Sequence, residues 1–269
     1  MIDHGLRVAR MCGGGAPAAR GAALSVLGAM GRTEESVPAG DAFAEDLCCT
    51  DHDIAALARR IVDSGRRDVS LCLSGPPGTG KSAFARHLAA RMGLEVVQKR
   101  ASDLLGLFVG ETEEKIADAF REAERQKAFL IFDEADSLLQ NRGGAVRAYE
   151  VSQVNEMLTW MERHPYPFAG TTNLPESLDP AAARRFVFKV RFLPLGPMQM
   201  RDAFRRTFGQ EAPARLLRAE RLTPGDFAVV ARRAAVLGER DVECLADALL
   251  AEEAAKPGAG RAMGFRAAV

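Results

Sequence analysis

Residues 75–82 read Gly75-Pro76-Pro77-Gly78-Thr79-Gly80-Lys81-Ser82, which fits the pattern G-x-x-x-x-G-K-[ST]. The stretch lies between an apolar segment at 69–73, which predicts a strand, and a predicted helix at 81–92. Glycines here let backbone N–H groups turn inward around phosphate oxygens, and the helix directs its positive end to the same place. Lys81 can reach the β- and γ-phosphates, and the Ser82 hydroxyl can hold Mg²⁺. We therefore predict a phosphate cradle made of Gly75, Pro76, Pro77, Gly78, Thr79, Gly80, Lys81, Ser82 and Ala83.

Two acidic residues, Asp133 and Glu134, follow the apolar run 129–132, one strand-helix unit after the cradle. Such a pair is most often a solvated strand end. Its place in the order of elements favours chemistry, because Asp133 would then lie near Mg²⁺ and Glu134 could polarise an attacking water. We predict Ser82 and Asp133 as the metal ligands, Asp133 as part of the nucleotide site, and Glu134 as a catalytic residue.

Apolar segments and amphipathic segments alternate along the chain from about residue 53. Strands are predicted at 69–73, 94–98, 128–132, 168–172 and 187–192, and helices at 53–63, 81–92, 111–126 and 147–163. This alternation predicts a parallel sheet with helices on both faces. After Pro194 the segments 198–208, 213–221, 224–237 and 242–255 all predict helices.

The pattern therefore divides the chain into three parts. Residues 1–45 form an Ala/Gly-rich lead-in expected to be flexible, 46–195 an α/β nucleotide-binding core, and 196–269 a helical lid domain. The lead-in leaves open whether the chain is a whole protein or the C-terminal part of a longer form.

The bulk composition excludes some classes of partner. Lys+Arg and Asp+Glu both total 36 in 269 residues, so the formal net charge is zero, which disfavours a general grip on nucleic acid or anionic membrane. No apolar run approaches the roughly 18–20 residues needed to span a membrane. Charged residues interrupt any signal-peptide core near the N-terminus, and the five cysteines lack metal-site spacing. We expect a cytoplasmic protein that binds neither membrane nor nucleic acid.

Three motifs together resemble a known family. The cradle, the stretch 132–138 with sequence FDEADSL, and Thr171-Thr172-Asn173 resemble the AAA+ ATPases, most of all the classical AAA clade that includes spastin, katanin and the FtsH proteases. The similarity covers about residues 50–255. It implies a P-loop NTPase sheet with strand order 5-1-4-3-2 followed by a small all-α lid, with ATP hydrolysis as the activity and ATP and Mg²⁺ as cofactors.

The resemblance also implies roles for residues outside the cradle. Asn173 would help to position the water beside Glu134. Arg184 and Arg185 resemble the arginine fingers that reach a neighbouring subunit's site, although the family's usual Arg-Arg-Pro-Gly-Arg-Phe is shorter here; Arg185, which precedes Phe186, is the safer match. Leu107, Phe108 and Val109 resemble the first pore loop, with Phe108 as the residue that grips a polypeptide.

The resulting functional hypothesis is an ATP-dependent homo-oligomeric ring, expected to be a hexamer, that remodels or threads a polypeptide substrate or works with an adaptor. The alternative is a nucleotide-dependent assembly switch that recruits partners without threading, which the featureless segment 1–45 keeps open. A small-molecule P-loop kinase would explain the cradle but not Asn173 or the arginine pair.

Overall fold

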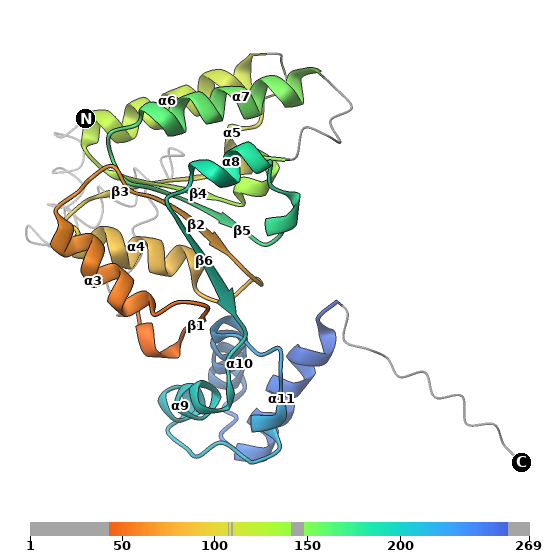
Figure 1. Ribbon diagram of the computed structural model, residues 1–269. Coiled ribbons are helices and arrows are strands. Elements are labelled where there is room, and N and C mark those ends of the chain that lie inside the picture. The colour runs from red at the N-terminus through yellow and green to blue at the C-terminus, as the bar shows by residue number, and fades with distance from the viewer. Residues whose placement is uncertain (1–42, 107, 109, 141–147, 258–269) are drawn as a thin grey trace, which may run out of the picture. The chain divides into compact units, whose positions relative to one another are not determined.

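A six-stranded sheet is the centre of the fold. The computed structural model describes residues 43–106, 108, 110–140 and 148–257 (Figure 1). The strands are β1 (Cys49–Thr50), β2 (Ser70–Ser74), β3 (Val96–Arg100), β4 (Phe129–Asp133), β5 (Phe168–Thr172) and β6 (Phe188–Leu193), in the order β1-β6-β2-β5-β4-β3. All neighbours are parallel except β1 and β6. The predicted order is confirmed, and the two-residue edge strand β1, too short to show a period, is an addition to it.

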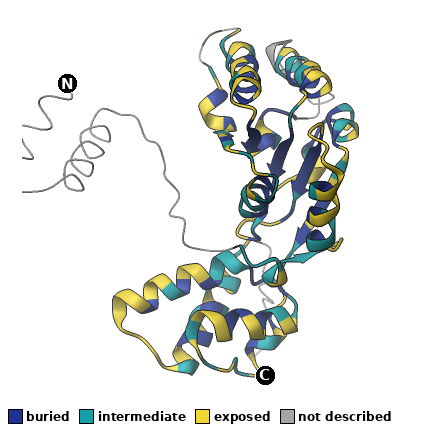
Figure 2. Cartoon of the chain, turned by 90° about the vertical axis from the view of Figure 1, so that its left-hand side faces the viewer, coloured by how far each residue is buried: buried dark blue, intermediate teal, exposed yellow. Residues whose placement is uncertain are grey.

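Helices cover both faces of this sheet. Helices α3 (Ile54–Ser64) and α4 (Lys81–Arg91) pack on one face, and α5 (Ala101–Leu104), α6 (Glu111–Gln126), α7 (Ala148–Arg163) and α8 (Pro180–Arg185) on the other. Strand β4 shows the cause, since successive side chains of a strand point to opposite faces. Phe129 and Ile131 are buried with α3 and α4, whereas Leu130 and Phe132 are buried with α6 and α7. The strands thus form the buried layer of Figure 2.

The C-terminal helices have a hydrophobic cluster of their own. Helices α9 (Pro197–Phe208), α10 (Pro224–Leu237) and α11 (Val242–Ala255) bury Met200, Phe204, Phe227, Leu245 and Leu249 against one another. Within the described part of the chain, no helix has the length and apolarity that crossing a membrane requires.

The helix predicted at 213–221 is wrong. The structure has only a short 3-10 turn there, η5 (Leu216–Arg218), and the chain is extended at Ala219. The backbone N–H groups of Glu220 and Arg221 donate instead to Glu253 Oε1 in α11, at 2.8 and 2.7 Å. A side chain from a distant helix therefore takes the donors that a continued helix would have used.

Other differences from the predicted elements are smaller. The strand predicted at 94–98 begins at Val96, because Leu94 N still bonds to Ala89 O and closes the end of α4. The four- and six-residue helices α5 and α8 were not predicted, since neither is long enough to show a helical period. Of the predicted lead-in, residues 1–42 lie outside the described residues, whereas Phe43 packs against Phe84 in α4, with ring centroids 5.9 Å apart.

One buried side chain of this core has no polar partner. His164 follows α7, is 7% exposed, and packs edge-on against Phe120 with ring centroids 5.1 Å apart. Neither ring nitrogen has a hydrogen-bond partner among the described residues. Burial lowers the pKa of this imidazole from 6.5 to about 4, so it stays neutral in the folded protein over a range where the unfolded chain takes up a proton.

Stability should therefore fall as the pH drops from 6.5 towards 4, because the unfolded state binds the proton that the folded state refuses. Replacing His164 by Phe removes this penalty. The gain in unfolding free energy should be larger at pH 5 than at pH 7 by about 2 kcal/mol, measured by urea denaturation. The same change at His52, whose side chain is 64% exposed, is the control for the substitution itself. An equal gain in unfolding free energy from His164→Phe at both pH values would contradict the lowered pKa of His164.

Candidate active site

The cradle, the acidic pair and Asn173 meet at the carboxyl end of the sheet. Loop 75–80 follows β2, Asn173 follows β5, and Asp133 and Glu134 stand at the end of β4. Strands β2, β5 and β4 are consecutive neighbours, so their carboxyl ends lie side by side. Ligands of open α/β sheets bind at this edge. Strand order therefore brings together groups that are far apart in sequence.

The Lys81 ammonium connects two of these segments. It is only 8% exposed, and its Nζ donates to Gly75 O at 2.7 Å, to Pro76 O at 2.8 Å and to Asn173 Oδ1 at 2.8 Å. An ammonium has three N–H donors, so all of them are used. A phosphate oxygen could be bound once one of these bonds, such as that to the exposed Asn173, is released.

Burial lowers the pKa of the Lys81 ammonium from 10.5 to about 8, and the carboxylates of Asp133 and Asp136 oppose that shift. The group is therefore still mostly charged at neutral pH. This charge is available to an anionic ligand at the mouth of the cradle.

The Asp133 carboxylate is held by donors from three elements. Its Oδ1 accepts from Ser82 Oγ at 2.6 Å and from Thr171 Oγ1 at 3.0 Å, and its Oδ2 accepts from the Gln98 side-chain amide. A hydroxyl and a carboxylate are the oxygen ligands that Mg²⁺ prefers, so the pair Ser82 and Asp133 fits that ion. Sequence reasoning missed Thr171 and Gln98; the available signal was a polar residue near the carboxyl end of a strand beside β4.

Glu134 has an unusual backbone conformation. Its φ is +58° and its ψ +40°, a left-handed conformation that non-glycine residues rarely adopt directly after a strand. Its N–H donates to Thr171 Oγ1 at 3.2 Å. A backbone conformation of this kind costs on the order of 1–3 kcal/mol and occurs most often at functional sites. The Glu134 side chain is exposed, so a ligand can contact it.

The rest of the cradle lies where the motif predicts. Thr79 is buried, and its Oγ1 donates to Pro76 O at 2.8 Å. Gly80 is the residue before α4, Pro77 is exposed in the loop, and Ala83 lies in the first turn of α4. The carbonyl of Gly78 accepts a hydrogen bond from Gly225 N of α10 at 2.9 Å, so the C-terminal helices contact the cradle directly.

The two arginines are not brought to this site. Ser70 Oγ, at the start of β2, donates to Arg185 O at 3.0 Å, so the pair lies at the amino end of the sheet. The five residues of β2 span about 13 Å, which separates the pair from the cradle of the same chain. The Arg185 side chain is bonded to Glu162 Oε1 at 2.8 Å and to Ala181 O at 3.0 Å. Arg184 is exposed, and its side chain has no hydrogen-bond or ion-pair partner in the described parts of the chain.

Phe108, the predicted gripping residue, has 76% of its surface exposed. It precedes α6, and its N–H donates to Glu111 Oε2 at 3.2 Å. Its predicted companions Leu107 and Val109 lie outside the described residues.

Comparison with known proteins identifies a family match over the sheet. Residues 71–193, from β2 to β6, match the family model of the ATPase family associated with various cellular activities (AAA). The chain carries an AAA domain. Its matched part contains the cradle, Asp133, Glu134, Asn173 and both arginines.

Several curated proteins are similar to the AAA domain. The ATPase family gene 2 protein homolog B of Mus musculus is 38% identical over 120 residues, which are 42% of this chain and 16% of the relative. The peroxisomal ATPase PEX6 of Rattus norvegicus is 35% identical over 131 residues, 46% of this chain and 13% of the relative. An uncharacterized protein, ORF529, of Acidianus two-tailed virus is 33% identical over 156 residues, 52% of this chain and 30% of the relative. The chain therefore spans less than a third of the length of these relatives.

The first glycine of the cradle is required by the fold itself. Gly75 has a φ of +138°, and a Cβ there would lie 2.2 Å from the backbone oxygen of Phe192. Gly65 also has a positive φ, +64°, but nothing lies within 4 Å of its Cβ position.

We expect Gly75→Ala to destabilise the protein by about 3–5 kcal/mol, because backbone strain and overlap with β6 add together. The matched control Gly65→Ala should cost only about 1–2 kcal/mol of strain. Denaturant unfolding measures the stability of both variants. Equal losses of unfolding free energy would mean that β6 shifts to accommodate the new methyl group without an energetic cost.

Proposed function

We propose that the chain is a subunit of a ring-forming ATPase that hydrolyses ATP with Mg²⁺ and remodels or threads a polypeptide. The observation that carries this proposal is the convergence of Lys81, Ser82, Asp133, Glu134 and Asn173 at one edge of the sheet. The AAA domain supports nucleotide binding and ATPase chemistry as the class of activity.

Each residue has a role that follows from its chemistry. The loop 75–80 and Lys81 bind the phosphates, and Ser82 and Asp133 hold Mg²⁺, which when bound neutralises phosphate charge. The Glu134 carboxylate orients the attacking water by accepting a hydrogen bond from it, and it then accepts the proton. Once Lys81 turns from Asn173 to a phosphate oxygen, the Asn173 amide is free to bind the same water.

The position of the arginines supports a shared site. Arg184 and Arg185 lie at the amino end of the sheet and cannot reach the cradle of their own chain. An arginine that completes an active site from this position must come from a second copy. The bond from Arg185 to the exposed Glu162 is worth at most about 1 kcal/mol, so it does not prevent Arg185 from doing so.

Further parts of the proposal concern the ring's action. Residues 46–195 act as the nucleotide-binding core and 196–269 as a lid that moves against it. Phe108, a large apolar side chain with 76% of its surface exposed, favours contact with a polypeptide over the assembly-switch alternative. ATP drives assembly of a homo-oligomer.

Glu134→Gln should bind ATP with the wild-type affinity within about twofold and lower the steady-state hydrolysis rate by about 100-fold or more, because the amide cannot accept the proton. Calorimetric titration and phosphate release measure the two quantities. The matched control is Glu176→Gln in the turn η4 (Pro175–Ser177), an exposed carboxylate just beyond Asn173, which should leave both unchanged. Full activity of Glu134→Gln would remove Glu134 from the mechanism.

The rate per subunit should rise with protein concentration as an ATP-dependent oligomer appears in parallel mass measurements. Arg184→Ala and Arg185→Ala should each lower the rate of the oligomer by about 1000-fold. Mixing either variant with Glu134→Gln subunits, which retain both arginines, should restore activity above that of each alone. If mixing restores the activity of only one of the two arginine variants, the residue replaced in that variant is the arginine that completes the neighbouring site. No rescue of either, in mixed oligomers of normal mass, would overturn the shared site.

A further inference from the structure

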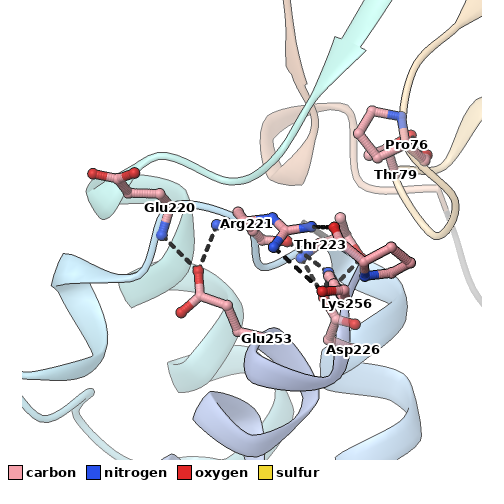
Figure 3. A network of polar contacts seen from close by, with 9 residues as sticks. Pro76, Thr79, Glu220, Arg221, Thr223, Asp226, Glu253 and Lys256 are labelled. Atoms are coloured by element: carbon pink, nitrogen blue, oxygen red, sulfur yellow. Dashed lines mark hydrogen bonds and ion pairs between the residues drawn. The ribbon is translucent and has the colours of Figure 1, made fainter. Parts of the chain in front are cut away.

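The C-terminal end of α11 is tied to the start of α10 by a half-buried lysine. Lys256 Nζ donates to Asp226 Oδ2 at 2.5 Å and to Arg221 O at 2.6 Å (Figure 3). The side chains are mostly covered, with 23% of Lys256 and 14% of Asp226 exposed. An ion pair of this kind is screened less by solvent than one on the surface.

The same carboxylate oxygen fixes the first turn of α10. Asp226 Oδ2 also accepts from Thr223 N at 2.6 Å and from Thr223 Oγ1 at 2.9 Å. Three donors therefore share one oxygen, and one of them is the Lys256 ammonium, whose charge strengthens the bond. Without Lys256 this mostly covered carboxylate would lose its ion pair.

The turn held in this way lies directly on the phosphate cradle. Gly225 N donates to Gly78 O at 2.9 Å. A Cβ on Gly78 would lie 2.8 Å from Thr223 Oγ1, and one on Gly225 would lie 2.8 Å from Gly78 Cα. The two backbones touch so closely that a shift of the α10 turn must move Gly78.

We propose that Lys256 is a positioning residue for nucleotide binding, acting through Asp226 and Thr223 to hold the first turn of α10 on Gly78. With its carbonyl fixed by Gly225, Gly78 keeps the orientation in which neighbouring N–H groups of the loop face the phosphates. Lys256 itself contacts no phosphate. The proposal rests on the proposed function insofar as the ligand is ATP. Apart from Gly78, the residues involved lie at 221–256, beyond the part of the chain that matches the AAA model.

A purely structural role is the competing explanation, and a neighbouring residue separates the two. Glu253, one turn before Lys256, accepts from the N–H groups of Glu220 and Arg221 at 2.8 and 2.7 Å. It stabilises the same junction of the C-terminal helices, but no described bond joins it to Asp226, Thr223 or Gly225. Loss of Glu253 should therefore weaken the helices without releasing the turn on Gly78.

The test compares Lys256→Met with Glu253→Met. Lys256→Met should raise the Kd for Mg·ATP, measured by calorimetry, by about fivefold to tenfold, the equivalent of one neutral hydrogen bond such as that from Gly225 N to Gly78 O. The kcat at saturating ATP should stay within about twofold, because the groups around the water are untouched. Glu253→Met, which removes the acceptor of the Glu220 and Arg221 N–H groups, should lower Tm at least as much while leaving the Kd unchanged. A rise in Kd that follows the fall in Tm equally in both variants would overturn the positioning role.

Hydrogen exchange on the unaltered chain tests the same link without any substitution. Because coupling is reciprocal, Mg·ATP should slow exchange of the amides at 225–227 and at the end of α11, residues 253–256. Unchanged exchange at 253–256, with ATP bound, would overturn the proposal. If the chain binds ATP but hydrolyses none, the proposed ATPase activity is refuted. The positioning role of Lys256 can still be tested in that case, because the Kd comparison and the exchange experiment need only ATP binding.

Discussion

The ammonium of Lys81 is buried to 8% exposure and needs acceptors that no single segment supplies. Two of its acceptors are carbonyls of the loop after β2, and the third is Asn173 Oδ1 after β5. A buried charge that loses its partners costs about 3–5 kcal/mol. The placement of β5 directly beside β2 is thus a condition for burying this lysine, and the same placement forms the candidate site.

The elements that the sequence predicted well are long enough to repeat their apolar pattern several times, or they carry a local signal at their ends. Helix α6 has sixteen residues with a regular apolar face, and α10 begins with a threonine and a proline at its start. The turn η5 failed as a helix because Glu253, more than thirty residues away, takes its backbone donors. No local pattern contains that information.

The candidate site divides in the same way. The cradle and Asp133 follow from contiguous motifs, whereas the groups that hold Asp133 depend on the register between strands. Gln98 pairs with Ile131, so its side chain lies diagonally across from Asp133, two residues further along β4. A shift of one residue in that register would turn Gln98 to the other face of the sheet. For this reason only a three-dimensional structure identifies Gln98 and Thr171 as supports.

The two ends of the sheet carry different parts of one proposed reaction. The cradle and Glu134 lie at the carboxyl end, whereas Arg184 and Arg185 lie at the amino end. Under the proposed mechanism, the arginines of one chain therefore serve the cradle of another chain. The cradle is also tied to the C-terminal helices through Gly78 and Gly225. A neighbour's arginine that arrives at the phosphates would therefore meet a loop whose shape already depends on α10 and α11. In the proposed ring, nucleotide binding, the C-terminal helices and the contact between subunits would then be linked through the backbone of Gly78.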